Sequence, residues 1–474
     1  MEIKSQSAFL AGFLGLSLAA SPALAPSPVR GGEGAAEAAV RPIKVPFTEF
    51  RLKNGLRVIL SEDHSAPTYA ICVTYNVGSR DEPKGQTGYA HLFEHMMFQG
   101  SEKVGKGEHF ILVQTYGGRS NGTTNADRTN YFETLPANQL DLGLFLEADR
   151  MRSLAVNQAN LDNQRHAVQE ERRLRVDNQP YGKTFEIVYE TAYDNFAYQH
   201  STIGSMEDLN AATVEDAASF FKAYYSPSNA VLSLVGDFKT EEALAKVKKY
   251  FEDIPARPLR PAADTSEPEQ KGERRRTIED AFAQRPRIDI VYKIPPGNTA
   301  DWLALEVLGR VLMSGRSSRL YQKLVKEKEA AVEVSGGAQE RRGPSLFWVV
   351  VMARPGKELA EIERLVDEEL SLIENELVAQ WEMEKAQMQG RSRHAEQLHS
   401  TQSRATRLGH YAVYYDDPSL LNTLEERIGR VTAEDLKRVA RSYLKKSNRT
   451  VVVTLPAAKA SRPPQRGKDG DETE

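Results

Sequence analysis

Apolar residues recur along the chain with two different periods, which predict its strands and helices. Residues 50–60 place apolar side chains on both sides of Asn54-Gly55, a dipeptide that favours a type I′ turn, and therefore predict a β-hairpin. Further strands are predicted over residues 69–77 and 231–236. Helical spacing of apolar residues predicts helices over residues 86–99, 106–116, 137–152, 158–176, 183–193 and 213–225.

The hydrophobic pattern is interrupted once, in the middle of the chain. Residues 256–284 are rich in arginine, proline and acidic side chains, and they predict an interdomain linker. After them, a predicted strand at 288–293 and a predicted helix at 302–313 restart the strand-then-helix order. We therefore expect an N-terminal domain over 47–255, a C-terminal domain over 285–456 and a charged, disordered tail over 457–474.

The two halves repeat each other at a spacing of 219 residues. Thr213 precedes Glu215-Asp216 in the first copy, and Thr432 precedes Glu434-Asp435 in the second. A threonine followed by acidic residues is typical of a capped helix N-terminus. The residues that follow repeat as well: Tyr224 and Tyr443, Ser228-Asn229 and Ser447-Asn448. We interpret the halves as duplicated domains.

The N-terminus has the pattern of a secretory signal peptide. Lys4 is followed by an apolar run over residues 8–20 and by the small-residue stretch Ala23-Leu24-Ala25. The run is shorter than the roughly 20 residues that a spanning helix needs. We expect a signal peptide over 1–25, a flexible leader over 26–46, and an exported, periplasmic protein with no integral membrane segment after signal removal. The alternative is an uncleaved anchor.

Composition and charge exclude several classes of protein. The 474 residues are 40% hydrophobic with a net charge of −4, which is ordinary globular composition without the basic excess of a nucleic-acid-binding surface. Cys72 is the single cysteine, so a disulfide framework and a cysteine-based zinc site within one chain are both excluded.

The segment His91-Leu92-Phe93-Glu94-His95 carries the clearest chemical signal. On a helix, His91 and His95 are four residues apart and share a face, so both imidazoles can bind one ion. Two imidazoles and a carboxylate suit zinc, which in catalytic sites keeps a position open for water. Glu94 is placed to accept the proton of that water as general base.

These residues are part of a wider resemblance to a known family. The segment HLFEH, followed about 76 positions later by Glu170-Glu171-Arg172-Arg173, resembles the M16 metallopeptidases, the group of pitrilysin, insulysin and the mitochondrial processing peptidase. The segment from Gly117 to Pro136 resembles the family's next conserved block. The resemblance implies that Glu171 is the third zinc ligand. Glu170 points about 100° away on a helix, as a solvated surface charge would.

The resemblance also implies a fold and a way of binding substrate. Each half is expected to be an α+β domain, with helices packed on an antiparallel-rich sheet. Short or unfolded peptides would be cleaved in a chamber. Asn121-Gly122-Thr123 would lie on an edge strand beside the metal, and a peptide would add to it as an extra strand.

The chain departs from the family pattern at two places. Where relatives often have an auxiliary acidic residue, seven positions before the ligand glutamate, this chain has Gln164. Active members usually carry an Arg and a Tyr, seven apart, in the second half to hold the substrate carbonyl and the oxyanion. The matching positions here are Val325 and Val332, which cannot donate hydrogen bonds. We therefore expect a heterodimer with a related subunit that carries the Arg/Tyr pair.

Three functions are compatible with the sequence. The first is a zinc-dependent endopeptidase with His91, His95 and Glu171 as ligands and Glu94 as base. The second is a non-catalytic structural subunit of the same fold. The third is a peptide-binding module with a structural zinc, although structural sites usually have four protein ligands.

Overall fold

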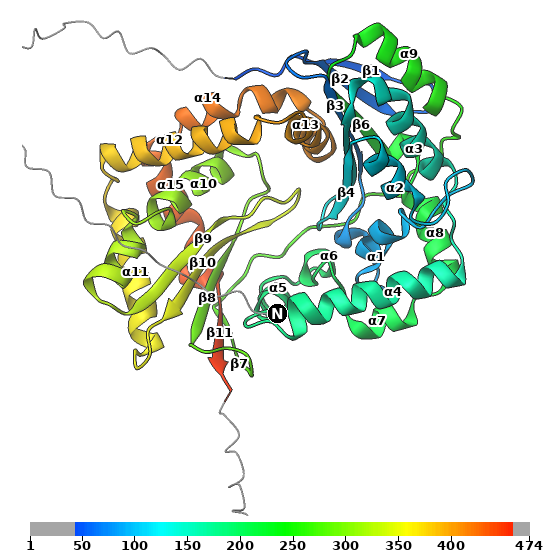
Figure 1. Cartoon of the computed structure of the whole chain (residues 1–474). Helices are drawn as coiled ribbons and strands as arrows, with labels where there is room; N and C mark the ends of the chain where they lie inside the picture. The colour runs from blue at the N-terminus through cyan, green and yellow to red at the C-terminus, as the bar shows by residue number, and fades with distance from the viewer. Residues whose placement is uncertain (1–42, 458–474) are drawn as a thin grey trace, which may run out of the picture. The chain divides into compact units, whose positions relative to one another are not determined.

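The computed structural model describes residues 43–457, which form two β-sheets with helices packed on them (Figure 1). The expected signal peptide, the leader up to residue 42 and the tail from residue 458 lie outside the described residues. Between residues 43 and 457 no helix combines the length and apolar character needed to cross a membrane.

The first sheet has six strands in the order β1-β2-β6-β3-β5-β4. All neighbours are antiparallel except β2 and β6, which run parallel. Its central strands β3 and β6 are buried along almost their whole length, because both faces of the sheet are covered. The strands are Thr48–Arg51 (β1), Arg57–Glu62 (β2), Thr68–Tyr75 (β3), Arg119–Thr124 (β4), Thr129–Pro136 (β5) and Ala230–Gly236 (β6).

The second sheet repeats this topology in the order β7-β11-β8-β10-β9. Again one pair of neighbours, β7 and β11, is parallel and the others are antiparallel. The strands are Arg274–Asp280 (β7), Arg287–Ile294 (β8), Ala331–Ala338 (β9), Ser345–Ala353 (β10) and Arg449–Pro456 (β11). The α+β fold class with antiparallel-rich sheets is confirmed.

The seven helices given ranges from the sequence are present as α1, α2, α3, α4, α5, α8 and α10, with ends within a few residues of the expected ones; the other helices had no predicted range. Those of the first half are Tyr89–Met96 (α1), Glu108–Thr115 (α2), Leu140–Arg152 (α3), Gln158–Arg172 (α4), Thr184–Ala192 (α5), Phe196–Gln199 (α6), Met206–Ala211 (α7), Val214–Tyr224 (α8) and Thr240–Phe251 (α9). Those of the second half are Ala300–Met313 (α10), Leu359–Asn375 (α11), Gln380–Gln397 (α12), Thr401–Tyr415 (α13), Leu424–Gly429 (α14) and Ala433–Tyr443 (α15).

The repeat at 219 residues corresponds to the same structural unit in both halves. Helices α8 and α15 begin after Thr213 and Thr432, and each threonine hydroxyl accepts a hydrogen bond from the backbone N–H three residues on. The side chains of Asp216 and Asp435 accept from the threonine backbone N–H in return. Both helices therefore start with a capping box.

Each half contributes one helix to the other half's sheet. Helix α13 packs on β3 and β6, where Leu408 joins an apolar cluster with Cys72 and Val235. Its backbone approaches the sheet closely, since a Cβ at Gly409 would lie 2.5 Å from Thr74 Oγ1. Helix α5 packs in turn on β8 and β11 of the second sheet. Each sheet is therefore covered in part by a helix that belongs to the other half of the sequence.

The predicted type I′ turn between β1 and β2 is wrong. Lys53 and Asn54 form the turn, and only Gly55 has a positive φ, +88°. The Asn54 side chain donates to the carbonyls of Phe251 and Ile254, at 2.7 and 3.0 Å. These buried hydrogen bonds to the end of α9 fix the conformation of Asn54 and override the local preference for a type I′ turn.

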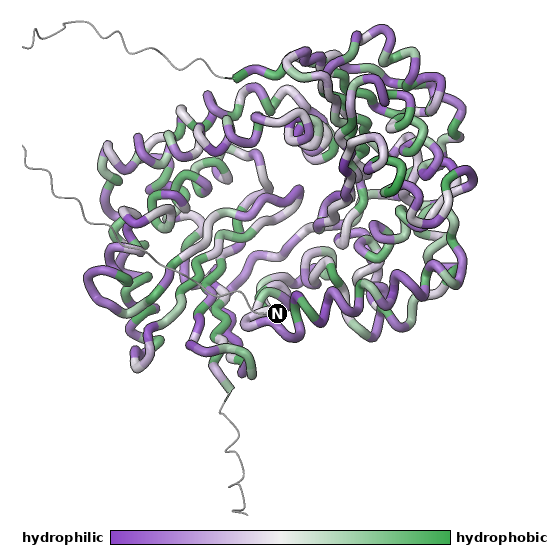
Figure 2. Tube along the Cα trace, viewed as in Figure 1, coloured by the Kyte–Doolittle hydropathy of each residue, from purple (hydrophilic) through white to green (hydrophobic). Residues whose placement is uncertain are grey.

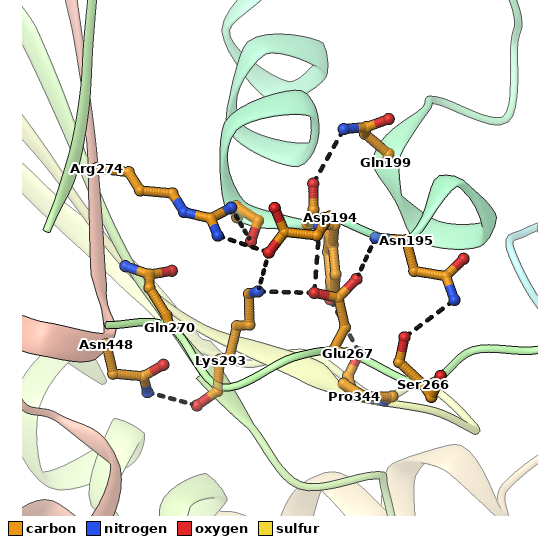
Figure 3. A network of polar contacts seen from close by, with 12 residues as sticks. Asp194, Asn195, Gln199, Ser266, Glu267, Gln270, Arg274, Lys293, Pro344 and Asn448 are labelled. Atoms are coloured by element: carbon orange, nitrogen blue, oxygen red, sulfur yellow. Dashed lines mark hydrogen bonds and ion pairs between the residues drawn. The ribbon is translucent and has the colours of Figure 1, made fainter. Parts of the chain in front are cut away.

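The segment expected to be a linker contains regular structure. Strand β7 occupies its second part, and the preceding residues are fixed by a polar network (Figure 3). The Glu267 carboxylate accepts from the backbone N–H of Asn195 and pairs with Lys293, whereas Arg274 pairs with Asp194. The charged side chains of this segment form ion pairs and hydrogen bonds with the rest of the protein. Composition alone cannot distinguish such a segment from a flexible linker.

Residues just before position 47, expected to belong to the flexible leader, are packed on the protein. Val45 is buried against α13, and its backbone N–H donates to the Asn422 side chain at 2.7 Å. The last part of the expected leader is therefore packed on the protein.

Candidate metal centre

Helix α1 is short and fixed at its N-terminus by a buried carboxylate. The Glu82 carboxylate accepts from the backbone N–H groups of Gly88 and Ala90, at 2.9 and 2.7 Å. Gly88 has a φ of +88°, and a Cβ there would lie 2.7 Å from the Ile203 carbonyl oxygen, so only glycine fits. An acidic group at this end is also favoured by the helix dipole. Glu82 thereby sets the position from which both histidines project.

The three expected metal ligands lie together on two adjacent helices. His91 and His95 of α1 face Glu171 of α4, whose Oε2 lies 3.6 Å from His91 Nε2 and 3.3 Å from His95 Nε2. One ligand atom from each residue lies within 4.8 Å of the others. Helix α4 is hydrophilic along most of its length (Figure 2).

Glu94 lies beside these ligands without being one of them. It is buried, and its Oε2 accepts a hydrogen bond from the Thr124 hydroxyl of β4. On the same strand, a Cβ at Gly122 would lie 3.0 Å from Glu94 Cγ. Burial raises the pKa of Glu94 above its ordinary value. A carboxylate with a raised pKa at this position is suited to accept a proton.

The surroundings of His91 and Glu171 favour the protonation states that a metal ligand needs, a neutral imidazole and an ionised carboxylate. Burial, reinforced by His95, lowers the pKa of His91 to about 4. The hydrogen bond from His95 lowers the pKa of Glu171. Arg175 pairs with the other Glu171 oxygen at 2.6 Å. This donor set, two imidazoles and one carboxylate, fits a divalent zinc ion.

Groups behind the ligands orient them. Gln164 Oε1 lies 3.2 Å from His95 Nδ1, where it can accept the ring N–H and leave Nε2 facing Glu171. Gln164, which stands where relatives often have an acidic residue, therefore keeps the hydrogen-bond acceptor but not the negative charge. Within residues 43–457, the buried His91 Nδ1 has no hydrogen-bond partner. Thr124 lies within the segment from Gly117 to Pro136 that resembles the family's conserved block, but nothing in that segment indicates its contact with Glu94, and no motif identifies Arg175.

The neighbouring residues of α4 and α5 have other contacts. Glu170 is exposed and pairs with Arg173 at 3.0 Å, away from the ligands, as expected for a surface charge. Arg172 points inward and binds both oxygens of Glu186, at 2.6 and 2.9 Å. This paired fork joins α4 to α5.

The segment Asn121-Gly122-Thr123 lies in β4, the edge strand of the first sheet, as the resemblance implies. Asn121 is exposed, and Thr123 donates from its hydroxyl to the Asn130 side chain at 2.7 Å. The outer edge of β4 pairs with no strand among the described residues.

Val325 and Val332 lie where the second half passes from helix to strand. Val325 is buried in the short helical segment Tyr321–Glu327, and Val332 is on β9, the edge strand of the second sheet. Neither side chain offers a hydrogen-bond donor.

Two family descriptions match most of the chain. Residues 57–206 match "Insulinase (Peptidase family M16)", and residues 211–389 match "Peptidase M16 inactive domain". The chain belongs to the M16 family. The zinc protease PqqE of Helicobacter pylori is 30% identical over 408 residues, which cover 85% of this chain and 92% of that protein. An uncharacterized zinc protease of Streptomyces coelicolor is 24% identical and covers 87% of this chain and 90% of that one.

Solved structures share the M16 fold along the chain. A Helicobacter pylori protease has a TM-score of 0.83 at 29% identity, covering 87% of this chain and all of that one. The periplasmic protease PqqL of Escherichia coli has a TM-score of 0.71 at 17% identity, covering 88% of this chain and 48% of that one. Complex III2 of Candida albicans contains a chain with a TM-score of 0.72 at 14% identity, covering 87% of this chain and 96% of that one, which shows the fold alone.

Proposed function

We propose that this M16 protein is a zinc-dependent endopeptidase that hydrolyses short or unfolded peptides. The observation that carries the proposal is the placement of Glu94 beside three convergent ligand atoms from His91, His95 and Glu171. Relatives named zinc proteases support the choice of metal.

The chain's own residues divide the chemistry between them. His91, His95 and Glu171 would hold zinc, which supplies Lewis acidity toward water and the peptide carbonyl. Glu94 takes up a proton at its carboxylate and passes it to the leaving amine. The Thr124 hydroxyl donates to Glu94 and holds it in one orientation. The burial that raises the pKa of Glu94 favours this uptake.

Substrate binding is proposed at the free edge of β4. An extended peptide would pair with the backbone at Asn121, Gly122 and Thr123, a mode that depends on main-chain hydrogen bonds and tolerates many sequences. The missing Cβ at Gly122 lets this strand lie against Glu94. The peptide would therefore lie beside the general base.

We propose that the active form is a heterodimer. Valines at positions 325 and 332 supply no donor to a developing oxyanion, and a related subunit with the Arg/Tyr pair would supply both. A homodimer of this chain would contain two metal centres and no such pair. The N-terminal signal pattern and the periplasmic relative PqqL support an exported, periplasmic location.

The alternative function is a non-catalytic structural or peptide-binding subunit. The description "inactive domain" for residues 211–389 and the similarity to a Complex III2 chain favour it. The retained ligands and base of the first half favour catalysis.

The Glu94→Gln variant tests the proposal. Because Glu94 is not a ligand, the variant keeps its zinc, but it loses nearly all hydrolysis of an unstructured peptide in the presence of the partner subunit. Zinc content by mass spectrometry and turnover are measured on the same preparation. Glu170→Gln, a matched exposed change, keeps both. Unchanged turnover in Glu94→Gln would refute the assignment.

A further inference from the structure

The second half contains a structural counterpart of the metal centre. In the first half, α1 packs between α4 and the edge strand β4; in the second, α10 packs between α12 and the edge strand β9. The strand orders of the two sheets place β9 at the position of β4. The space between α10, α12 and β9 is therefore equivalent to the space that the metal ligands enclose.

The residues at the equivalent positions differ in chemistry. Glu306 and Arg310 lie 215 positions after His91 and His95, and they pair with each other. Gly309 takes the position of the base Glu94. It also lies against Gly337 of β9 as Glu94 lies against Gly122, since a Cβ at Gly309 would be 3.1 Å from Gly337 Cα.

The third ligand is replaced by a glycine too. Gly390 lies 219 positions after Glu171, and a Cβ on it would be 3.6 Å from Arg310 Nε. Two glutamate side chains of the metal centre are thus absent from the counterpart. A cavity of about 220 Å³ lies at this place, bordered by Gly390 and by the Glu306–Arg310 pair.

The cavity walls carry a small excess of positive charge. Arg310, Arg393 and Arg407 line it together with two glutamates, Glu306 and Glu340. Glu306 pairs with Arg310, whereas Arg393 and Arg407 form no ion pair within residues 43–457. Arg407 acts on Glu340 through space, and Glu340 is also held by His410 and Tyr415. The cavity lining therefore holds three arginines against two glutamates.

A buried histidine side chain in the same wall lacks a partner. His394 is 3% exposed, lines the cavity, and its Nδ1 has no hydrogen-bond partner among the described residues. A buried polar atom without a partner is costly unless a ligand satisfies it. Burial lowers the pKa of His394, so the ring is neutral at pH 7 and does not change the charge balance.

We propose that this cavity is a carboxylate-binding site, in which Arg393 and Arg407 hold the anion and the apolar side chains of Trp302, Leu303 and Ile428 contact the group attached to it. Guanidinium groups match carboxylates in geometry and charge. A carboxylate matches the small positive excess of the cavity lining. The carboxylate is either that of a small free acid or the C-terminal carboxylate of a peptide.

Calorimetric titration of the purified full chain tests the site. The probes are N-acetyl-leucine and its amide, which differ in the carboxylate alone, and a leucine-ended pentapeptide with a free or an amidated C-terminus. The peptides are titrated into the Glu94→Gln variant, so that binding is measured without hydrolysis. Because no turnover is involved, the result is independent of whether the protein is a peptidase.

We expect the free acids to bind and the amides to bind at least tenfold more weakly. Arg407→Gln and the exposed Arg393→Gln should each lower the affinity about tenfold or more. The control Arg364→Gln, an exposed arginine paired with Glu368 on α11, should not. Binding by N-acetyl-leucine alone identifies a small acid as ligand, and tighter binding by the free pentapeptide identifies a peptide terminus.

Two results would overturn the proposal. One is equal binding, or none, by the acids and their amides. The other is wild-type affinity in both Arg393→Gln and Arg407→Gln. Arg393 is exposed and its replacement leaves the fold intact, so this variant decides the matter if Arg407→Gln shows a lower unfolding temperature.

Discussion

At the scale of single residues, the local sequence pattern predicts the ligands His91 and His95, but it does not predict the residues that surround them. His91, Glu94 and His95 are recognisable because their spacing on one helix has a chemical meaning. Glu171 comes from a different helix and needed a family resemblance. Thr124 could not be predicted, because its contact with Glu94 depends on how β4 lies against α1.

The assignment of the third ligand can be tested by a pair of neighbouring substitutions. Glu171→Gln should lower zinc affinity by at least tenfold, since Glu171 faces both histidines. Glu170→Gln should leave it unchanged, since Glu170 pairs with Arg173 on the exposed side. Zinc affinity is measured by competition with a chelator. Loss of zinc in the Glu170 variant alone would show that Glu170, and not Glu171, is the third ligand.

A second residue-scale prediction concerns a buried carboxyl away from the metal centre. Glu133 is fully buried with Glu147 and Arg150 beside it, and its Oε1 lies 2.6 Å from His109 Nε2. Burial raises the pKa of Glu133 to about 7. The folded state therefore holds this proton more tightly than the unfolded chain, and its stability falls as the pH rises from about 4.5 to about 7.

Glu133→Gln removes this pH dependence, because the amide does not ionise. We expect the unfolding temperature of the variant, relative to the wild type, to be higher at pH 8 than at pH 5. Differential scanning calorimetry at the two pH values measures the change. The exposed Glu241→Gln should show the same small difference at both pH values, and the same behaviour in Glu133→Gln would contradict the raised pKa.

At the scale of elements, hydrophobic periodicity predicted seven of the helices and the strands β2, β3, β6 and β8, because a helix face or strand that packs on a core must be apolar. It gave no range for the other helices or for the buried strands β5 and β10. It failed where long-range polar contacts decide. The Asn54 side chain bonds to the end of α9 instead of shaping a type I′ turn. Likewise, Arg274 in the expected linker pairs with Asp194 and starts strand β7.

The repeated capping boxes give a prediction for an element. Thr432→Ala removes the hydroxyl that accepts the Asp435 N–H and should destabilise the protein by about 1 kcal/mol. In a chain of this length that lowers the unfolding temperature by about 1 to 2 °C. Thr432→Ser keeps the acceptor and serves as the control. Equal unfolding temperatures for the two variants would show that the cap contributes nothing.

At the scale of the whole molecule, the sequence indicated duplication but not the sharing of helices. Nothing in the periodicity of residues 401–415 tells which sheet α13 covers, because the choice depends on tertiary packing. The expected boundaries at residues 255 and 285 divide the sequence repeat. They do not divide the packing, since α5 and α13 each lie on the other half's sheet.

The proposed assembly is tested by reconstitution. Purified alone, this chain should bind zinc and cleave peptides poorly, because Val325 and Val332 offer no oxyanion donors. Adding a related subunit that has the Arg/Tyr pair should raise turnover about 100-fold or more, the usual effect of such a donor. A partner in which that pair is replaced by valines is the control. Full activity of the isolated chain, at concentrations where no partner is present, would contradict the heterodimer.

The exchange of α5 and α13 has a consequence for how the protein can be divided. A fragment ending near residue 255 would lose α13 and expose Cys72, Val231 and Val235 on the outer face of its sheet. The complementary fragment would lose α5 and expose Val291 and Trp348. Each fragment would therefore expose an apolar sheet face and tend to aggregate, so the elements from β1 to β11 have to be kept together when the protein is shortened or transplanted.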